Sequence, residues 1–297
     1  MYYNDNTILY FNGRMVKAVD AGTDLYGQTL HYGYGVFEGI RSYQTNTGIK
    51  IFKAKEHYDR LIRSCELLNI PFSYSVEELT NLTYELLALN NFTEAYIRPL
   101  VICGHGMSLQ KPVDSTLIIE AWNWDSYLGE KLLRLKISPF CRPHPKSTKV
   151  DAKACGHYVN SILAGTDAKD SGFDEALLLD HQGYLAEGPG ANLFFEKNGK
   201  LFTPQPGNIL TGITRATIFE IGNQLGIDVE EGQYTPEELL NADSAFYCGT
   251  GAEVVGIKSV NEKIFPKRWN DSIGKIIQQA YKLVVREEEF KNILRVA

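Results

Sequence analysis

Apolar residues recur three or four positions apart in several segments, which is the spacing of one face of a helix. Residues 55–68 and 76–89 show this pattern. Residues 214–225 show it again before Gly226, a residue type that commonly ends helices. The pattern therefore predicts helices over residues 55–68, 76–89, 158–170, 214–225 and 272–290.

Shorter apolar runs that are bounded by glycine, asparagine or charged residues predict strands. Asn12-Gly13 and Asn198-Gly199 each separate two such runs, and Asn-Gly favours the tight turn of a β-hairpin. The expected strands are residues 8–11, 15–16, 95–103, 115–122, 133–138, 175–180, 184–187, 192–196, 201–203, 244–248 and 253–257.

These elements follow one another without strict alternation of strand and helix. This favours an α+β fold, with two mixed β-sheets and flanking helices, over a doubly wound fold. The 297 residues suit one large domain or two ordinary ones. We expect a smaller N-terminal domain over residues 1–122, an interdomain loop over 123–132 and a larger domain over 133–297. The polar stretch 123–130 also fits a surface loop.

Composition narrows the possible partners and location. The net charge of −6 gives no general attraction to nucleic acid or to an anionic membrane. The five cysteines are widely spaced without a CxxC pair, which argues for reduced thiols and against a zinc site or a disulfide framework. No signal-peptide pattern or long uncharged apolar run occurs, so we expect a cytoplasmic protein without a metal site.

The segment around Glu187 is the first candidate for chemistry. This acid follows a short apolar run and precedes Gly188-Pro189-Gly190 and a second apolar strand. An acid at the end of a strand, beside backbone with few side chains, can face a flat ligand that lies against the chain.

Two further segments have the backbone character of anion sites. Residues 209–215 contain Gly212 at the start of the predicted helix 214–225, where unpaired amides and the helix dipole attract anions. Residues 248–253 place small residues after a strand. The first segment is either a phosphate cradle or a threonine-capped helix, and the second is either an anion site or a tight loop.

Three other segments carry charged or aromatic candidates. Lys153 lies among small residues before an apolar helix, where burial would lower the pKa of a reactive amine; a solvated lysine is the alternative. Residues 31–41, rich in glycine and aromatics, form either a pocket wall or a packed strand edge. Arg98 interrupts an apolar strand, so it binds an anion or forms a structural ion pair.

Taken together, six stretches spread over nearly the whole chain resemble branched-chain amino acid aminotransferases. They are HYGYGVFEGIR, YIRP, KACGHYVNS, EGPGANLF, GITR and CGTGAE, in the order and at roughly the separations found in that family. These enzymes are fold-type IV enzymes that use pyridoxal 5′-phosphate (PLP), with the D-amino acid aminotransferase-like fold.

The resemblance implies a role for each matching residue at the cofactor. Lys153 matches the lysine that forms a Schiff base with PLP and moves protons during the reaction. Glu187 matches the acid beside the pyridine nitrogen, and Tyr158 matches a phenol near the ring hydroxyl. The remaining cofactor-binding matches are Arg60, Leu210, Ile213, Thr214 and Thr250. The helical pattern alone would leave Arg60 in solvent, away from the apolar face of helix 55–68.

The same resemblance implies transamination of L-leucine, L-isoleucine and L-valine with 2-oxoglutarate, which gives branched-chain 2-oxo acids and L-glutamate. The matching apolar-pocket residues are Tyr32, Phe37, Trp124 and Tyr127; those for the distal carboxylate of glutamate are Arg98, Tyr32 and Arg41; and those for the α-carboxylate are Gly251 and Ala252. A homodimer or higher homo-oligomer is also implied.

Two departures from the family pattern occur. His157 stands before Tyr158 where asparagine is common, and Ala191 stands where a second acid is frequent. The alternatives within the fold are a D-amino acid aminotransferase, an (R)-selective amine transaminase and a lyase acting on aminodeoxychorismate. An alternative of another class is a catalytically silent PLP-binding protein.

Overall fold

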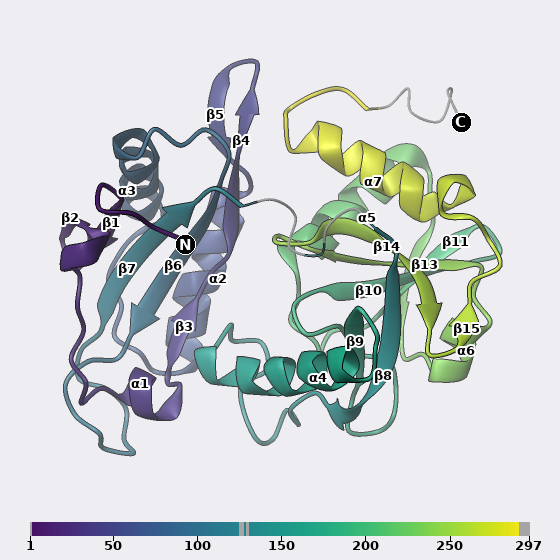
Figure 1. The fold of residues 1–297 in the computed structure, drawn as a ribbon, viewed down its shortest axis with the longest axis horizontal. Helices are drawn as coiled ribbons and strands as arrows, with labels where there is room; N and C mark the ends of the chain where they lie inside the picture. Colours follow the sequence, from purple (N-terminus) through teal and green to yellow (C-terminus); the bar gives the residue numbers. More distant parts are fainter. Residues whose placement is uncertain (1, 125–127, 129–130, 291–297) are drawn as a thin grey trace. The chain divides into compact units, whose positions relative to one another are not determined.

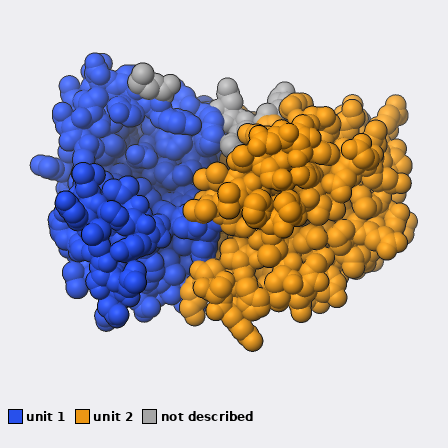
Figure 2. Space-filling view, turned by 60° about the horizontal axis from the view of Figure 1, so that its bottom comes forward, with its two compact units in different colours: residues 1–125, 152–157 blue, residues 126–151, 158–297 orange. Residues whose placement is uncertain are grey.

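The computed structural model describes residues 2–124, 128 and 131–290. Its contacts divide the chain into two compact units, coloured separately in Figure 2. Unit 1 comprises Met1–Asp125 and Ala152–His157, and unit 2 comprises Ser126–Asp151 and Tyr158–Ala297. A short segment with Lys153, expected in the larger C-terminal domain, groups with the first unit instead.

Unit 1 is built on a seven-stranded sheet of order β2-β1-β7-β6-β4-β5, with β3 beside β6 (Figure 1). Every pairing between named strands in the described part of this sheet is antiparallel. Its helices and strands are α1 (Gln28–Tyr32), α2 (Ala54–Leu67), α3 (Val76–Leu89), β1 (Ile8–Phe11), β2 (Arg14–Lys17), β3 (Gly35–Phe37), β4 (Ile40–Thr45), β5 (Gly48–Ile51), β6 (Ala95–Ile102) and β7 (Thr116–Trp122).

The helices α2 and α3 pack on this sheet because each has one apolar face. Leu61 of α2 and Leu79 and Leu86 of α3 are buried in one core with Ile97 and other sheet residues. A capping box starts α3: the side chain of Ser75 accepts from Glu78 N, and the Glu78 side chain accepts from Ser75 N. The core of unit 1 thus fixes α2 against the strands that bear candidate site residues.

Unit 2 is built on an eight-stranded sheet of order β12-β11-β10-β13-β14-β8-β9, with β15 beside β14. This sheet is mixed, because β8 pairs in parallel with β9 and β14 whereas β10, β13 and β14 pair antiparallel. Its elements are α4 (Tyr158–Asp170), α5 (Ile213–Leu225), α6 (Pro236–Leu240), α7 (Ile273–Val284), β8 (Leu133–Cys141), β9 (Glu175–Leu179), β10 (Asn192–Lys197), β11 (Lys200–Pro204), β12 (Val229–Gly232), β13 (Ser244–Gly249), β14 (Glu253–Val260) and β15 (Lys263–Ile264).

The central strands of unit 2 are buried on both faces. On one face Phe194 of β10 stacks on Phe246 of β13, with ring centroids 5.2 Å apart, and α7 packs against these strands. On the other face Leu193 and Tyr247 belong to a second core. Strands covered on both faces read as nearly continuous apolar runs, as the sequence of β13 does.

The expected α+β class is confirmed, and α2, α3, α4 and α5 match the helices predicted from periodicity. Two predictions are wrong. Residues 184–187 make only isolated bridges, because Leu185 N donates to Tyr234 O and Pro189 has no amide hydrogen to continue a ladder. The C-terminal helix α7 ends at Val284 rather than at residue 290. The backbone turns directly after Val284, and Glu287 adopts a left-handed φ of 59°.

The structure contains neither a candidate membrane span nor a candidate metal site among the residues it describes. Over the residues it describes, no helix has both the length and the apolar character that crossing a bilayer requires. The same residues contain no cluster of three metal-ligating side chains.

The stacked pair in unit 2 gives a stability test. Replacing Phe246 with alanine removes a fully buried ring and leaves a cavity, so we expect a loss of about 3–5 kcal/mol in the free energy of unfolding. Phe140→Ala is the matched control, because that ring is 38% exposed. Urea unfolding followed by circular dichroism measures both, and equal midpoints would contradict this packing.

Candidate functional site

Strand pairing holds Lys153 in unit 1. Phe37 N donates to Lys153 O at 3.1 Å, and Lys153 N donates to Ser64 Oγ of α2 at 3.0 Å. The next residue, Ala154, forms a bridge with Val36 of β3. The Lys153 side chain is half-buried, and its Nζ lies 5.0 Å from the centroid of the Phe37 ring. The segment that carries the lysine is thus an addition to β3.

The Phe37 ring also contacts Arg98 of β6. The guanidinium carbon lies 4.6 Å from the Phe37 centroid, 5.3 Å from that of Tyr96 and 5.9 Å from that of Trp122. Arg98 Nη2 donates to the Tyr96 hydroxyl at 3.1 Å, while Nε is buried without a hydrogen-bond partner among the described residues. An aromatic surround with an unsatisfied cationic donor suits a ligand that is partly apolar and partly anionic.

Strand geometry explains this cluster. Tyr96 and Arg98 are two residues apart on β6 and share a face, whereas Ile97 points into the core. Gly39 makes room for the tyrosine, because a Cβ at that position would lie 2.0 Å from its hydroxyl oxygen. Across the sheet, burial raises the pKa of Glu120, and the charge of its pairing partner Arg98 opposes this rise.

The other residues expected to bind the substrate differ in their contacts and in their exposure to solvent. Arg41 donates through Nη2 to the carbonyl oxygen of Trp124, so these two predicted residues are brought together. Tyr32 ends α1, is 49% exposed and donates its hydroxyl to Met107 O at 3.1 Å. Tyr127 lies outside the described residues.

Arg60 is not the solvated residue that the helical pattern indicates. Its side chain is only 13% exposed, because it forms an ion pair with Glu38, which follows β3 directly and is fully buried. Sequence reasoning missed Glu38 as a partner. The available signal was an acid inside the otherwise apolar and aromatic segment 31–41.

In unit 2, hydrogen-bond donors and an arginine surround the carboxylate of Glu187. Asn192 Nδ2 donates to Oε2 at 3.0 Å, and Leu210 N donates to Oε1 at 3.0 Å. Arg142 Nε lies 2.9 Å from Oε1, but its direction does not satisfy hydrogen-bond geometry, so this contact is an ion pair. Because Arg142 and Glu187 are both buried, their pairing offsets the cost of removing each charge from water.

Strand β9 places this pair. Arg142 follows β8 and donates its amide to Leu179 O at 2.8 Å, and Leu178 N donates to Glu187 O at 2.9 Å. Sequence reasoning missed Arg142, since this charge lies in a polar, proline-rich stretch that resembles a surface loop. Asn192 was also missed, although it stands five positions after the acid and starts β10.

Asn192 joins three of the segments singled out in the sequence. Its Nδ2 also donates to Leu210 O at 2.9 Å, and its backbone pairs with Cys248. A Cβ on Gly212 would lie 2.1 Å from Asn192 Oδ1, so a larger residue there would displace the Asn192 side chain. The segments 187–192, 210–214 and 248–252 therefore converge around this one side chain.

The N-terminus of α5 has the character of an anion site. Its N-cap is Gly212, which supplies no side-chain hydrogen bond, and Ile213 and the buried Thr214 contribute the first helical amides. On the neighbouring strand, Gly249 packs closely on the 187–192 segment: a Cβ there would lie 3.0 Å from Gly190 O. This donor set and close backbone packing fit a phosphorylated flat cofactor.

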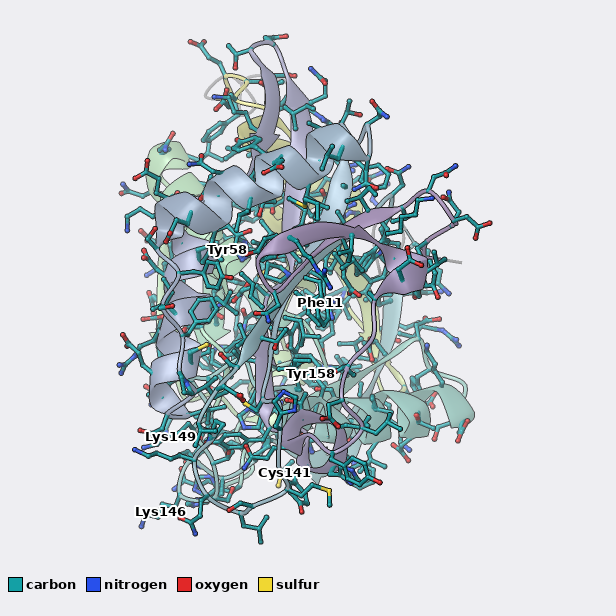
Figure 3. The ribbon with its side chains drawn as sticks, turned by 90° about the vertical axis from the view of Figure 1, so that its left-hand side faces the viewer. Phe11, Tyr58, Cys141, Lys146, Lys149 and Tyr158 are labelled. Carbon is teal, nitrogen blue, oxygen red and sulfur yellow. The ribbon has the colours of Figure 1, made fainter. Side chains whose placement is uncertain are left out.

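The remaining predicted residues have clear positions in unit 2. Thr250, Gly251 and Ala252 form the turn between β13 and β14. Tyr158 is the first residue of α4 and is half-buried (Figure 3). The two other lysines of the KSTKVDAK segment, Lys146 and Lys149, are exposed, as their labelled side chains show in the same figure.

Comparison with known proteins agrees with this arrangement. The family model described as amino-transferase class IV matches residues 35–260, which is most of the chain. This chain belongs to that family. The branched-chain-amino-acid aminotransferase of Pseudomonas aeruginosa strain PAO1 is 39% identical over 280 residues, covering 92% of this chain and 91% of that protein. The resemblance found in the sequence is therefore confirmed.

Solved structures of this family share the whole fold. The crystal structure of the Escherichia coli branched-chain amino acid aminotransferase matches with a TM-score of 0.91 at 37% identity, covering 95% of this chain and 96% of that chain. The branched-chain amino acid aminotransferase of Thermobaculum terrenum, solved in its PLP form, matches with a TM-score of 0.89 at 30% identity, covering 97% of this chain and 98% of that chain.

The packing of Gly212 generates a prediction. Gly212→Ala forces Asn192 away from its position, which loosens the hold on Glu187, so we expect the amino-transfer rate to fall by roughly tenfold to a hundredfold. Gly165→Ala is the control, because a Cβ in that part of α4 makes an ordinary contact at 3.5 Å. Steady-state assays compare the two, and equal rates would show that this close fit is unimportant.

Proposed function

We propose that this protein is a PLP-dependent branched-chain amino acid aminotransferase. It transfers the amino group of L-leucine, L-isoleucine or L-valine to 2-oxoglutarate, giving branched-chain 2-oxo acids and L-glutamate. One observation carries the proposal: the Phe37 ring lies beside both the amine of the half-buried Lys153 and the guanidinium of Arg98. A candidate acid–base amine and a candidate carboxylate-binding group thus share one apolar wall, as amino-acid chemistry requires.

The cofactor follows from the family and from the donor set. PLP, when bound, supplies a protonated ring that accepts the electrons left when a bond to the substrate Cα breaks. Glu187 is the ring-nitrogen acid, and Asn192, Leu210 N and Arg142 hold its carboxylate in place. The phosphate is bound by the start of α5, and the residues assigned to it are Arg60, Ile213, Thr214 and Thr250.

Lys153 carries the proton transfer. Its Nζ takes the proton from the substrate Cα as a general base and, as a general acid, would deliver it to C4′ of the cofactor. The hydrogen bonds that Lys153 N and O make to Ser64 and Phe37 fix the backbone from which this amine reaches the substrate. Tyr158, at the first position of α4, is assigned to the ring hydroxyl, and Leu210 to the face of the ring.

One pocket then accepts both kinds of substrate side chain. Phe37 supplies apolar surface for a branched chain, and Arg98 supplies charge for the distal carboxylate of glutamate. The Arg98 Nε, which is buried without a partner among the described residues, gains one from that carboxylate. The other residues assigned to this pocket are Tyr32, Arg41, Trp124 and Tyr127, and Gly251 and Ala252 bind the α-carboxylate.

Exposed apolar side chains support a homodimer or a higher homo-oligomer. On α4, Val159, Ile162 and Leu163 lie close together along the helix and are 61%, 67% and 47% exposed. Contiguous apolar surface of this kind marks interfaces.

We also assign the enzyme to the cytoplasm, because all five cysteines are free thiols, as expected in a reducing compartment.

A panel of amino acids tests this function directly. Purified protein loaded with PLP is mixed with one amino acid at a time, and the visible absorption of the bound cofactor is followed. L-Leucine, L-isoleucine, L-valine and L-glutamate should each convert it to the amino form, whereas D-alanine should not.

The other outcomes of this experiment have distinct meanings. Conversion by D-alanine but not L-leucine would identify a D-amino acid aminotransferase. Pyruvate release from aminodeoxychorismate without an amino acceptor would identify a lyase. PLP binding without conversion by any amine would identify a catalytically silent protein.

Removing the amine of residue 153 tests the catalytic assignment. Lys153→Ala should lower turnover by at least about a thousandfold, because both the covalent attachment and the acid–base group are lost. Lys149→Ala is the matched control, since that lysine is exposed four positions earlier. Fixed-time assays of L-leucine consumption compare the two variants, and full activity in Lys153→Ala would refute the catalytic role of Lys153.

A further inference from the structure

Unit 1 contains a buried charged cluster of Glu38, His57 and Arg60. Glu38 is fully buried and His57 is 1% exposed, and their side chains are joined by a 2.7 Å contact between Nδ1 and Oε2. Arg60 donates to the same carboxylate twice, through Nε at 2.6 Å and through Nη2 at 2.9 Å. Only the arginine has a role in the proposed reaction so far.

The protonation states in this cluster follow from burial and charge. Burial alone would raise the pKa of Glu38, but the charge of Arg60 and the hydrogen bond from His57 outweigh it and hold that pKa well below its usual value. Burial, together with the charges of Arg60 and Lys153, lowers the pKa of His57, and the contact with Glu38 only partly opposes this. Glu38 is therefore an anion and His57 a neutral donor through Nδ1, because an ionised carboxylate only accepts.

This pairing fixes the plane of the guanidinium. A two-point contact between an arginine and a carboxylate sets orientation as well as distance, whereas a lone arginine side chain samples many rotamers. Glu38 takes donors from the edge formed by Nε and Nη2, so the orientation of Nη1 is set as well. The carboxylate itself is held by the histidine on α2 and cannot turn freely.

Helix α2 links this cluster to the reactive lysine. His57, Arg60 and Ser64 are spaced three and four residues apart, so they share one face of the helix. Ser64 Oγ donates to Arg60 O at 2.8 Å and accepts from Lys153 N at 3.0 Å. One helical face therefore fixes both the backbone of Lys153 and the guanidinium of Arg60.

We propose that Glu38, held by His57, is a positioning residue that orients Arg60 toward the phosphate group of the cofactor; this rests on the proposed function. Two effects of Glu38 on phosphate binding oppose each other. Its charge partly neutralises Arg60, which weakens the attraction for an anion, but its two-point contact removes the entropy cost of ordering the arginine. Orientation outweighs neutralisation in this proposal.

The test compares two ligands that differ only in the phosphate. Dissociation constants of PLP and pyridoxal are measured on the full-length apoenzyme by fluorescence quenching in phosphate-free buffer, and their ratio is the phosphate selectivity. Glu38→Gln should weaken PLP binding roughly tenfold or more and leave pyridoxal binding nearly unchanged. Unchanged or increased selectivity in a folded Glu38→Gln protein would overturn the proposal.

Two further variants separate positioning from general stability. Glu196→Gln is the matched control: Glu196 is also fully buried and accepts from Ser244 and Ile273 N in unit 2. It should lower the melting temperature without changing phosphate selectivity. Arg60→Ala should lose selectivity, and adding Glu38→Gln to it should cause no additional loss, because the two residues act through one contact.

These measurements also distinguish the inference from the function on which it rests. If Arg60→Ala keeps full phosphate selectivity, the role proposed for Arg60 fails. If Arg60→Ala loses selectivity but Glu38→Gln keeps it, only the inference fails. Should Glu38→Gln not fold, His57→Gln replaces it, with the same direction of change expected and an unchanged selectivity counting against the proposal.

Discussion

The candidate site depends on one constraint: residues 152–157 belong to unit 1, although the chain before and after them belongs to unit 2. Residues 152–157 pair with β3 through Val36 and Phe37, and Ser64 of α2 binds the amide of Lys153. Gly33 closes the other end: its oxygen accepts from Gly156 N at 2.9 Å, and a Cβ on Gly33 would lie 2.8 Å from the Gly156 Cα. Hydrogen bonds of the backbone, together with the burial of Ala152 and Ala154 in the core of unit 1, thus place the proposed reactive amine.

Each unit contains a buried carboxylate, whose removal from water costs free energy unless the charge is paired. In unit 1 Glu38 is held by an arginine and a histidine, and in unit 2 Glu187 is held by an arginine, an asparagine amide and a backbone amide. Full pairing keeps such an anion ionised inside the protein and prevents it from turning. A rigid donor arrangement is what a site needs when it must present charge to a cofactor without reorganising.

Local patterns in the sequence predicted much of the helical framework. The helices α2, α3 and α5 were found because their apolar faces repeat at helical spacing and because Gly226 marks an end. Residues 31–41, which contain β3, were left as either a pocket wall or a strand edge, and β4 and β5 were not predicted. Segment 31–51 mixes glycine, aromatic and polar residues, and its strands are defined by pairing with β6 and with one another. Pairing between strands that are far apart in the sequence does not produce a recognisable spacing of apolar residues.

For the candidate site too, some residues were predictable from the sequence and their contacts were not. Family motifs singled out Lys153, Glu187 and Arg98 as candidates, because chemistry restricts the residue types at those positions. They did not indicate that Lys153 groups with the first unit, that Arg60 is buried against Glu38, or that Arg142 supports Glu187. Each of these facts depends on contacts between residues far apart in sequence, and a charge in a polar stretch looks like a surface charge until the fold is known.

One chemical trapping measurement tests directly whether the amine of Lys153 carries the cofactor. Protein loaded with PLP is reduced with borohydride, which makes the bond between lysine and cofactor permanent, and its peptides are analysed by mass spectrometry. We expect a phosphopyridoxyl group on Lys153 alone. The same group on Lys149 or another lysine, with Lys153 unmodified, would contradict the claim.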